Sequence, residues 1–378
     1  ASQQSIARAS SARAPRAAMA AMATASSRKP LSRDRLALCQ DRRRAEALQR
    51  QRDARRNLAD HARALAAPEP EAPRMDVDAT LSKAELKRRR ADREARARAA
   101  KWSLEFCIPE WLVEIPPDLN GKGDAHGGGW YVVPRPEGKR CLVVASRGKT
   151  ASRLPHGDVL HRWRSAVPSG SPQTATKDDQ ATVLECVFYE PSSTYFVVDV
   201  MTWGGYSLYD CTAEFRFYWL RTKLGELEPP EEAAPYSLSP APYFDADGDG
   251  VLAAHGGPLP YLRDGLLFYA KQGHYALGPT PLVALFKDAA CTRYFAADDE
   301  TLFVVLRHER GELRTLDGTA VPRAAAAAEA FAEGELARFQ LVPAGDGVAA
   351  AFDRRCSNKR ALPDSASKIA FALRHKTR

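Results

Sequence analysis

The distribution of aromatic residues is the feature that most constrains how this chain can fold. None of its 14 Phe, 12 Tyr and 6 Trp residues precedes Trp102 in a sequence of 378 residues. A stretch without aromatic side chains has little large apolar surface to bury, and burial is what stabilises a packed core. We therefore expect one packed domain over residues 102–345, a long arm before it and a polar tail at 346–378.

The charge is as uneven as the aromatic content. Residues 1–101 carry 25 Lys and Arg against 12 Asp and Glu, whereas the rest of the chain carries 30 against 35. A basic arm on a mildly acidic body indicates an acidic partner for the arm: nucleic acid, an anionic membrane or an acidic protein surface. If the body binds RNA, we expect it to use a local pocket.

The arm is expected to contain a helix at 28–66. No Gly or Pro lies between Leu31 and Ala67, and most residues there favour helix. The apolar stripe of this segment is too thin to bury on a core of its own, so a partner should stabilise it. Composition alone leaves three interpretations open: a solvated charged helix, a general nucleic-acid-binding arm and a receptor-binding helix.

Two further segments flank this helix. Residues 1–27 are rich in Ala, Ser and Arg and lack acidic residues. Such a composition is typical of a disordered tail, which we favour, and also of an organelle transit peptide. Residues 67–101 are expected to be a linker, which is acidic and Pro-rich at first and strongly basic from Lys83.

Neither the cysteines nor the acidic clusters predict a metal or a cofactor. The seven Cys are scattered without a C-x-x-C pair, which fits a reducing compartment and argues against disulfides or a zinc site. Residues 245–250 begin like a calcium loop, but Gly256 stands where a bidentate Glu is needed. No apolar run approaches the ~18 residues of a membrane span, so we expect no membrane partner.

The body alternates strand and turn signals. Apolar runs predict strands near 130–134, 141–147, 182–189, 195–201, 265–269 and 302–307. Residues 209–224 and the Ala-rich residues 322–337 favour helix. This mixture predicts an α+β fold with a mainly antiparallel sheet.

Four parts of the chain resemble the snurportin family, whose members are import adaptors for spliceosomal small nuclear RNPs. They lie at 42–66, at 110–112 with 138–148, at 195–219 and at 264–283. Their order and spacing agree over about 30–285. The resemblance implies a domain similar in fold to the nucleotidyltransferase core of capping enzymes and ATP ligases, with a basic helical arm before it.

The resemblance also implies partners and a location. The body would bind a trimethylguanosine-capped small nuclear RNA, and the arm would bind importin β. A nuclear export receptor would return the protein, which would shuttle between nucleus and cytoplasm. The arm residues implicated in importin binding are Arg42, Arg43, Arg44, Leu48, Arg52, Arg55, Arg56 and Leu58.

The resemblance argues against catalysis. Capping enzymes and ligases need the Lys of a K-x-D-G-x-R motif, and Arg135 stands in its place. Arginine has essentially no neutral, nucleophilic form. The metal-binding Glu of those enzymes falls at Val187, and their paired lysines fall at Ala284 and Phe286. Two rival functions remain: a nucleotidyltransferase that uses Lys139, and a general RNA-binding protein with a basic arm.

The candidate cap-binding residues follow from the same comparison. A methylated cap offers a cationic base that stacks on aromatic faces and a triphosphate that attracts Lys and Arg. The residues implied are Trp111, Lys139, Arg140, Lys149, Arg153 and Phe286. Trp111 has a core-anchoring alternative, and the basic pair at 139–140 could instead be a solvated strand end.

The family's stacking Trp is absent, because Leu285 stands in its position, and Pro109 replaces a family Ser. Phe286 after a one-residue shift, Trp102 and Trp130 are the alternative stacking platforms, unless none remains.

Overall fold

The structure is a computed structural model of the chain, and it describes residues 33–53, 59–67, 82–117, 119, 129–175, 180–227, 234–295, 302–324, 330–344, 347–357 and 360–375. The predicted tail at 1–27 lies outside these residues. Within them, no helix is both long enough and apolar enough to cross a membrane.

The chain divides into two compact units. One contains Arg42–Glu110 and Glu114–Ala296, and the other contains the chain up to Asp41, Trp111–Val113 and Ala297–Arg378. The body that the sequence predicts as a single domain at 102–345 is thus split near Ala297.

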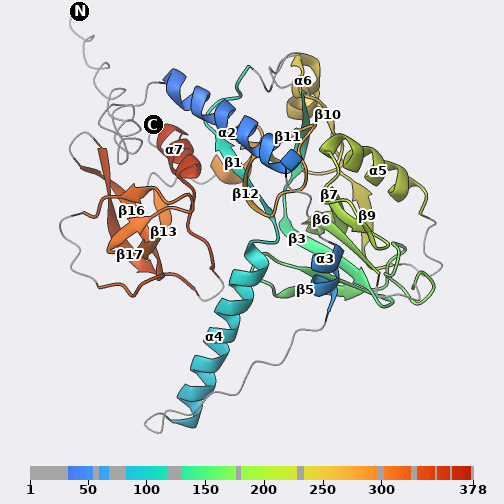
Figure 1. The fold of residues 1–378 in the computed structure, drawn as a ribbon, viewed down its shortest axis with the longest axis horizontal. Coiled ribbons are helices and arrows are strands. Elements are labelled where there is room, and N and C mark those ends of the chain that lie inside the picture. The colour runs from blue at the N-terminus through green and yellow to red at the C-terminus, as the bar shows by residue number, and fades with distance from the viewer. Residues whose placement is uncertain are drawn as a thin grey trace, which may run out of the picture. The chain divides into compact units, whose positions relative to one another are not determined.

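The larger unit contains two mainly antiparallel sheets (Figure 1). The first has the order β1-β12-β11-β2-β10, and its strands pair antiparallel where their register is defined. Its strands are β1 (Cys107–Leu112), β2 (Trp130–Pro136), β10 (Phe244–Asp245), β11 (Arg263–Ala270) and β12 (Gly278–Phe286). In this sheet the end of β2 lies beside the start of β11, and the start of β11 lies beside the end of β12. The charged residues at these strand ends are described below.

The second sheet has the order β5-β4-β3-β6-β7-β8, with β9 parallel to β7. Its strands are β3 (Lys139–Ser146), β4 (Lys149–Arg153), β5 (Val159–Trp163), β6 (Ala181–Tyr189), β7 (Thr194–Trp203), β8 (Tyr206–Ser207) and β9 (Ser237–Pro240). All residues of β7 and nearly all of β6 are buried. The near-continuous apolar runs of these strands follow from burial on both faces.

Helices α4 (Lys83–Ser103), α5 (Ala213–Gly225) and α6 (Gly248–Gly256) belong to the same unit. A capping box between Ser82 and Glu85 fixes the start of α4. This helix extends away from the sheets (Figure 1), and its buried residues are Ala99 and Trp102 near its end. Most of the basic side chains of α4 therefore remain exposed.

The smaller unit has its own antiparallel sheet, in the order β15-β14-β13-β16-β17. Its strands are β13 (Phe303–Glu309), β14 (Glu312–Arg314), β15 (Ala320–Val321), β16 (Leu336–Ala344) and β17 (Gly347–Arg355), and α7 (Ala366–His375) follows them. Ile369 and Leu373 of α7 pack in one core with the sheet residues Leu306 and Phe339.

Two expectations for this region differ from the structure. The supposed polar tail at 346–378 contains β17 and α7, because pairing of β17 with β16 buries its alanines. The Ala-rich segment at 322–337 is not helical where it is described, since it includes the start of β16. Tertiary pairing here overrides the helix preference of alanine. The other predicted strands and the helix near 209–224 are confirmed.

Candidate functional site

Arg140 forms a buried ion pair with Glu185 across β3 and β6. The Arg140 Nε lies 2.7 Å from Glu185 Oε1, and the Glu185 side chain is 2% exposed. Although burial works against the charge, Glu185 keeps the pKa of Arg140 above its usual value. Glu185 lies two residues from Val187, so both project from the same face of the strand. Val187 lies directly opposite Arg140 in the strand register, but Glu185 supplies the negative charge that pairs with Arg140.

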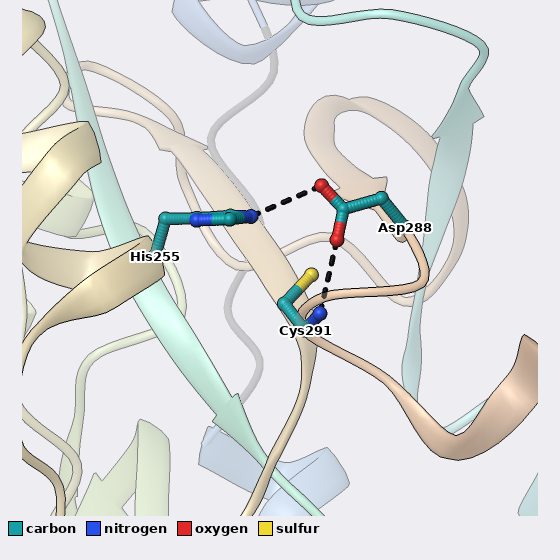
Figure 2. Close-up of side chains that lie close together, drawn as sticks. All are labelled: His255, Asp288 and Cys291. Atoms are coloured by element: carbon teal, nitrogen blue, oxygen red, sulfur yellow. Dashed lines mark hydrogen bonds and ion pairs between the residues drawn. The ribbon is translucent and has the colours of Figure 1, made fainter. Parts of the chain in front are cut away.

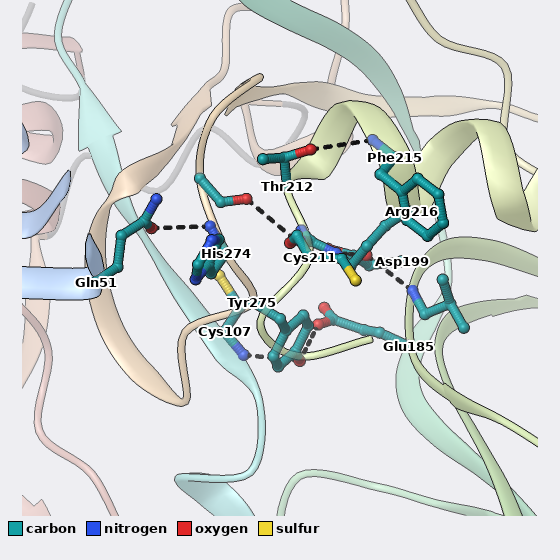
Figure 3. Close-up of polar contacts among 12 residues, drawn as sticks. Gln51, Cys107, Glu185, Asp199, Cys211, Thr212, Phe215, Arg216, His274 and Tyr275 are labelled. Carbon is teal, nitrogen blue, oxygen red and sulfur yellow. Dashed lines mark hydrogen bonds and ion pairs between the residues drawn. The ribbon is translucent and has the colours of Figure 1, made fainter. Parts of the chain in front are cut away.

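Tyr275 extends this ion pair into a polar network (Figure 3). Its hydroxyl donates to Glu185 Oε2 at 2.5 Å and accepts from the Cys107 backbone N–H at 3.2 Å. Beside it, Arg216 makes a bidentate pair with Asp199, with distances of 2.8 and 2.9 Å. All of these side chains except the partly exposed Arg140 are buried, and each charge in the network has an opposite partner. They are structural pairs of the kind that a buried charge requires.

A second charged cluster joins the ends of β2, β11 and β12. Asp264 accepts hydrogen bonds from Arg135, from Lys287 Nζ at 2.7 Å and from Thr292. Burial lowers the pKa of Lys287, with Asp264 opposing that effect. Although burial works in the other direction, Arg135 and Lys287 hold the pKa of Asp264 below its usual value. The residue in the place of the enzymes' nucleophile is thus held in an ion pair.

The two clusters together carry an excess of positive charge. Arg140 lies near enough to Arg135 for its charge to lower the pKa of Arg135, although burial is the larger cause. Three cations, Arg135, Arg140 and Lys287, face two carboxylates, Asp264 and Glu185. A partly buried positive excess attracts phosphate groups, since water screens it poorly. This arrangement can hold a polyphosphate near the ends of β2 and β3.

The predicted basic residues of the β3–β4 hairpin do not gather at one point. Lys139 begins β3, is exposed, and lies 3.4 Å from Glu190. Lys149 is exposed and pairs in register with Ser146, which is about 23 Å along the strand from Lys139 at ~3.3 Å per residue. Arg153 lies between them, with its guanidinium 4.9 Å from the ring centroid of Trp102. Lys149 therefore lies at the far end of the hairpin from the charged clusters.

The aromatic alternatives for base stacking differ in accessibility. Trp102 is 1% exposed beneath Arg153, and Trp130 is 5% exposed. Leu285, in the family's Trp position, is buried. Phe286 is half-buried next to Lys287 at the end of β12. Of these positions, Phe286 is the most exposed, and it precedes Lys287 in the chain.

A cavity of about 330 Å³ lies elsewhere in the larger unit. It is lined mainly by apolar side chains of β2, β7, α5 and the chain around β10, among them Val133, Phe217 and Tyr243. Its volume falls at the lower end of the range for small-ligand pockets. Nothing in the sequence pattern predicts it, because its lining comes from four separate segments.

Trp111 packs within the smaller unit. Its ring centroid lies 5.0 Å from that of Phe371 in α7, and its backbone N–H donates to Ser367 Oγ at 3.2 Å. Lys368 Nζ lies 5.9 Å from the Trp111 ring centroid. These contacts agree with the core-anchoring alternative for Trp111.

The arm helix α2 (Arg33–Asp53) packs on the larger unit from Arg42 onward. Arg44 is 4% exposed, and its guanidinium lies 5.1 Å from the ring centroid of Trp130. Gln51 donates to the Gln272 carbonyl at 2.6 Å and accepts from the His274 N–H at 2.9 Å (Figure 3). The contacts are completed by buried Leu48 and by an ion pair between Arg43 and Glu110 at 3.1 Å.

The short helix α3 (Ala59–Ala66) packs on the same unit. His61 Nε2 lies 2.5 Å from Glu105 Oε2, and Ala62 and Leu65 are buried. The hydrogen bond to Glu105 raises the pKa of His61.

The expectation that the arm's apolar stripe lacks a partner within the chain is therefore wrong. The side chains of Leu48 and Leu65 are buried against the larger unit. Arg42 and Arg52 remain exposed on α2, whereas Arg55, Arg56 and Leu58 lie outside the described residues.

Three charged residues of the site were missed by reasoning from the sequence: Glu185, Asp264 and Lys287. Glu185 stands out as a single charge inside an apolar strand, at 181–189, and this signal was available. Lys287 lies one residue from the position where the enzymes' lysine was sought. The role of Asp264 depends on strand pairing between β2, β11 and β12, which the sequence does not specify.

Comparisons with known proteins give one family match and several similar solved structures. Residues 105–288 match the family described as Snurportin1, m3G cap-binding domain. Similar solved structures include a mycobacterial DNA ligase D complexed with ATP and MES, at 14% identity and a TM-score of 0.34 over 68% of this chain and 98% of that chain. The ligase domain from M. tuberculosis LigD has 12% identity and a TM-score of 0.34 over 68% and 97%. A Lig E DNA ligase has 11% identity and a TM-score of 0.32 over 66% and 98%.

The larger unit is an α+β domain with mainly antiparallel sheets. Over residues 105–288 the match is specific, and this domain is snurportin-like. The match supports binding of an m3G cap, and hence of capped RNA, by this domain.

Proposed function

We propose that this protein is a non-catalytic nuclear import adaptor, which binds the trimethylguanosine cap of small nuclear RNPs and links them to importin β. The match of residues 105–288 to the cap-binding family carries the proposal. The cations Arg135, Arg140 and Lys287 support it, because a triphosphate brings the charge that balances them.

The proposal that the protein is not an enzyme is based on the ion pairs and exposure of its basic residues. Arg135 cannot act as a nucleophile, and its guanidinium is paired with Asp264. Lys287 Nζ is held by the same carboxylate. Lys139, the nucleophile of the rival enzyme, is an exposed side chain beside Glu190. Glu185, the carboxylate nearest the enzymes' metal-binding position, is committed to Arg140 and Tyr275.

The transport half of the proposal rests on the arm. Exposed Arg42 and Arg52 offer positive charge to an acidic receptor surface. Arg44 and Leu48 face the body instead, so full engagement by a receptor requires α2 to leave the body. Docking of the arm and binding of importin β thus compete. Shuttling between nucleus and cytoplasm, with return by an export receptor, belongs to the same proposal.

A bridging experiment tests the adaptor directly. Beads carrying trimethylguanosine-capped RNA are incubated with importin β, with and without the full chain. The proposal predicts that importin β is recovered only when the chain is present, and not when residues 28–66 are deleted. Recovery of the chain without importin β would leave cap binding intact and remove the adaptor. Uncapped RNA is the control for general RNA binding.

A further inference from the structure

A His, an Asp and a Cys meet at the end of the first sheet, beside the cluster of Asp264, Lys287 and Thr292. His255 lies in the last turn of α6, and Asp288 and Cys291 lie in the turn after β12. The His255 Nε2, a carboxylate oxygen of Asp288 and the Cys291 Sγ all lie within 4.8 Å of one another. Figure 2 shows the three side chains pointing toward one shared space.

The separations suit tetrahedral coordination. A zinc ion with bonds of ~2.0–2.1 Å to nitrogen and oxygen and ~2.3 Å to sulfur places its ligand atoms about 3.3–3.7 Å apart. His255 Nε2 and Asp288 Oδ2 are already 3.0 Å apart. To admit the ion, these two atoms must part by a few tenths of an ångström and all three ligand atoms, now within 4.8 Å of one another, must converge on it. The His255 and Asp288 side chains are each 33% exposed and can adjust.

The surrounding hydrogen bonds hold the three ligands in place. Asp288 Oδ1 accepts the backbone N–H groups of Ala290 and Cys291, at 3.0 and 2.9 Å, which turns Oδ2 toward His255. The Cys291 carbonyl accepts from the Gly265 N–H at 2.6 Å, which fastens this turn to β11. Partners of this kind orient metal ligands before the metal arrives.

We propose that His255, Asp288 and Cys291 bind one Zn²⁺ ion, with water in the fourth position. Sulfur and imidazole nitrogen favour zinc over the oxygen-preferring Ca²⁺ and Mg²⁺. On binding, the Cys291 thiol gives its proton to water and its sulfur bonds to the metal, so the two anionic ligands balance the charge of the ion. The site ties α6 to the end of β12, and its metal binding can be measured without RNA or importin β.

The ordinary alternative is a capped turn with a surface ion pair. In that case Asp288 caps the turn, contacts His255 and accepts a hydrogen bond from the buried Cys291 thiol. The cobalt titration described below separates this alternative from a metal site. The sequence conceals this site, because Asp288 and Cys291 come from one turn while His255 lies more than thirty residues earlier. The scattered cysteines therefore do not exclude zinc, contrary to the expectation from their spacing.

Cobalt substitution in the purified full chain tests the proposal. Titration with Co²⁺ should produce a thiolate-to-cobalt charge-transfer absorption at one equivalent, and Zn²⁺ should remove it. Cys291→Ser should abolish this absorption, and His255→Ala should weaken Zn²⁺ affinity by at least about tenfold. Cys356→Ser, at a half-buried cysteine of the smaller unit, should leave both unchanged.

Two results would overturn the site: no cobalt absorption in the folded protein, or an absorption that persists in Cys291→Ser. His255→Ala keeps the test valid if Cys291→Ser fails to fold, because the His255 side chain is partly exposed and its loss should be tolerated. Unaltered Zn²⁺ affinity in His255→Ala would also contradict the proposal.

Discussion

Arg44 of the arm lies over the ring of Trp130 in the body, with 5.1 Å between the guanidinium carbon and the ring centroid, and both side chains are buried. A cation on an aromatic face is also how a methylated cap base binds a protein. Arg44 of the arm thus makes with the body a cation–aromatic contact of the kind that the body's proposed ligand, the methylated cap, would make. This docking turns the arm from a free helix into one whose receptor affinity depends on the body.

Weakening the docked state from the body side should strengthen receptor binding. Glu105→Gln with Glu110→Gln removes the partners of His61 and Arg43 but leaves the arm sequence intact. Partly exposed ion pairs contribute at most about 1 kcal/mol each, so importin β affinity should rise about two- to fivefold. Surface plasmon resonance measures this change.

Arg42→Ala is the matched control, since Arg42 is exposed and contacts Glu46 of the same helix. It should weaken receptor binding without altering docking. Unchanged importin β affinity in the double variant would show that docking and receptor binding do not compete.

The docking of α3 should depend on pH through His61. Its folded-state pKa is raised, above all by the hydrogen bond to Glu105, with Lys101 opposing and the Tyr209 ring nearby. The stabilisation is therefore fully present below the unfolded pKa of about 6.5, and it is lost as pH rises through the docked pKa. NMR titration of His61 should give a higher pKa in the full chain than in Glu105→Gln. Equal values would remove Glu105 as the cause.

Arg140→Ala should lower the stability of the fold as well as the affinity for the ligand. Arg140→Ala leaves Glu185 buried with only Tyr275 as a partner, so unfolding should become easier by about 3–5 kcal/mol. Lys139→Ala, at the exposed neighbouring position, should change stability by less than about 0.5 kcal/mol. Chemical denaturation measures both. Similar, small losses in both variants would contradict the buried pair.

Glu185→Gln in the Arg140→Ala background should recover part of the lost stability, because it removes the unpaired charge. A loss of capped-RNA binding in Arg140→Ala is therefore interpretable only together with this stability measurement.

No covalent nucleotide should form on the protein. Incubation with labelled GTP or ATP and magnesium, followed by denaturation, should leave no label, because Arg135 has no nucleophilic form and Lys287 is bound to Asp264. If label appears, its loss in Lys139→Ala or in Lys287→Ala identifies the nucleophile. Lys287 is included because burial lowers its pKa, as in lysines that do attack phosphates.

The sequence predicted the larger unit better than the smaller one. The strands of the former are long and strongly apolar, so alternation or continuous burial reveals them, as at 181–189 and 194–203. In the smaller unit β17 is rich in Ala and Arg, and only its pairing with β16 makes it a strand. Side-chain contacts between remote segments, such as Arg44 with Trp130 and Arg135 with Asp264, cannot be obtained from local pattern at all.

In the candidate site too, the sequence predicted positions along the strands but not the contacts between strands. The resemblance located Lys139 and Arg140 in one strand, but it did not predict that a buried Glu would occupy Arg140 while Lys139 stays exposed. The loss of the family's stacking Trp at Leu285 was visible in the sequence. Which ring replaces it depends on burial, which favours Phe286 over Trp102 and Trp130.

Cap discrimination by the full chain tests the central claim most directly. Fluorescence competition with trimethylguanosine-capped, monomethyl-capped and uncapped RNA should rank the affinities in that order. Phe286→Ala should reduce the preference by about 1–2 kcal/mol, or five- to thirtyfold, whereas Phe215→Ala, at an exposed aromatic of α5, should not. If Phe286→Ala is silent and Tyr243→Ala removes the preference, the base lies in the cavity beside β7. Equal affinities of the unaltered protein for all three RNAs would contradict cap binding itself.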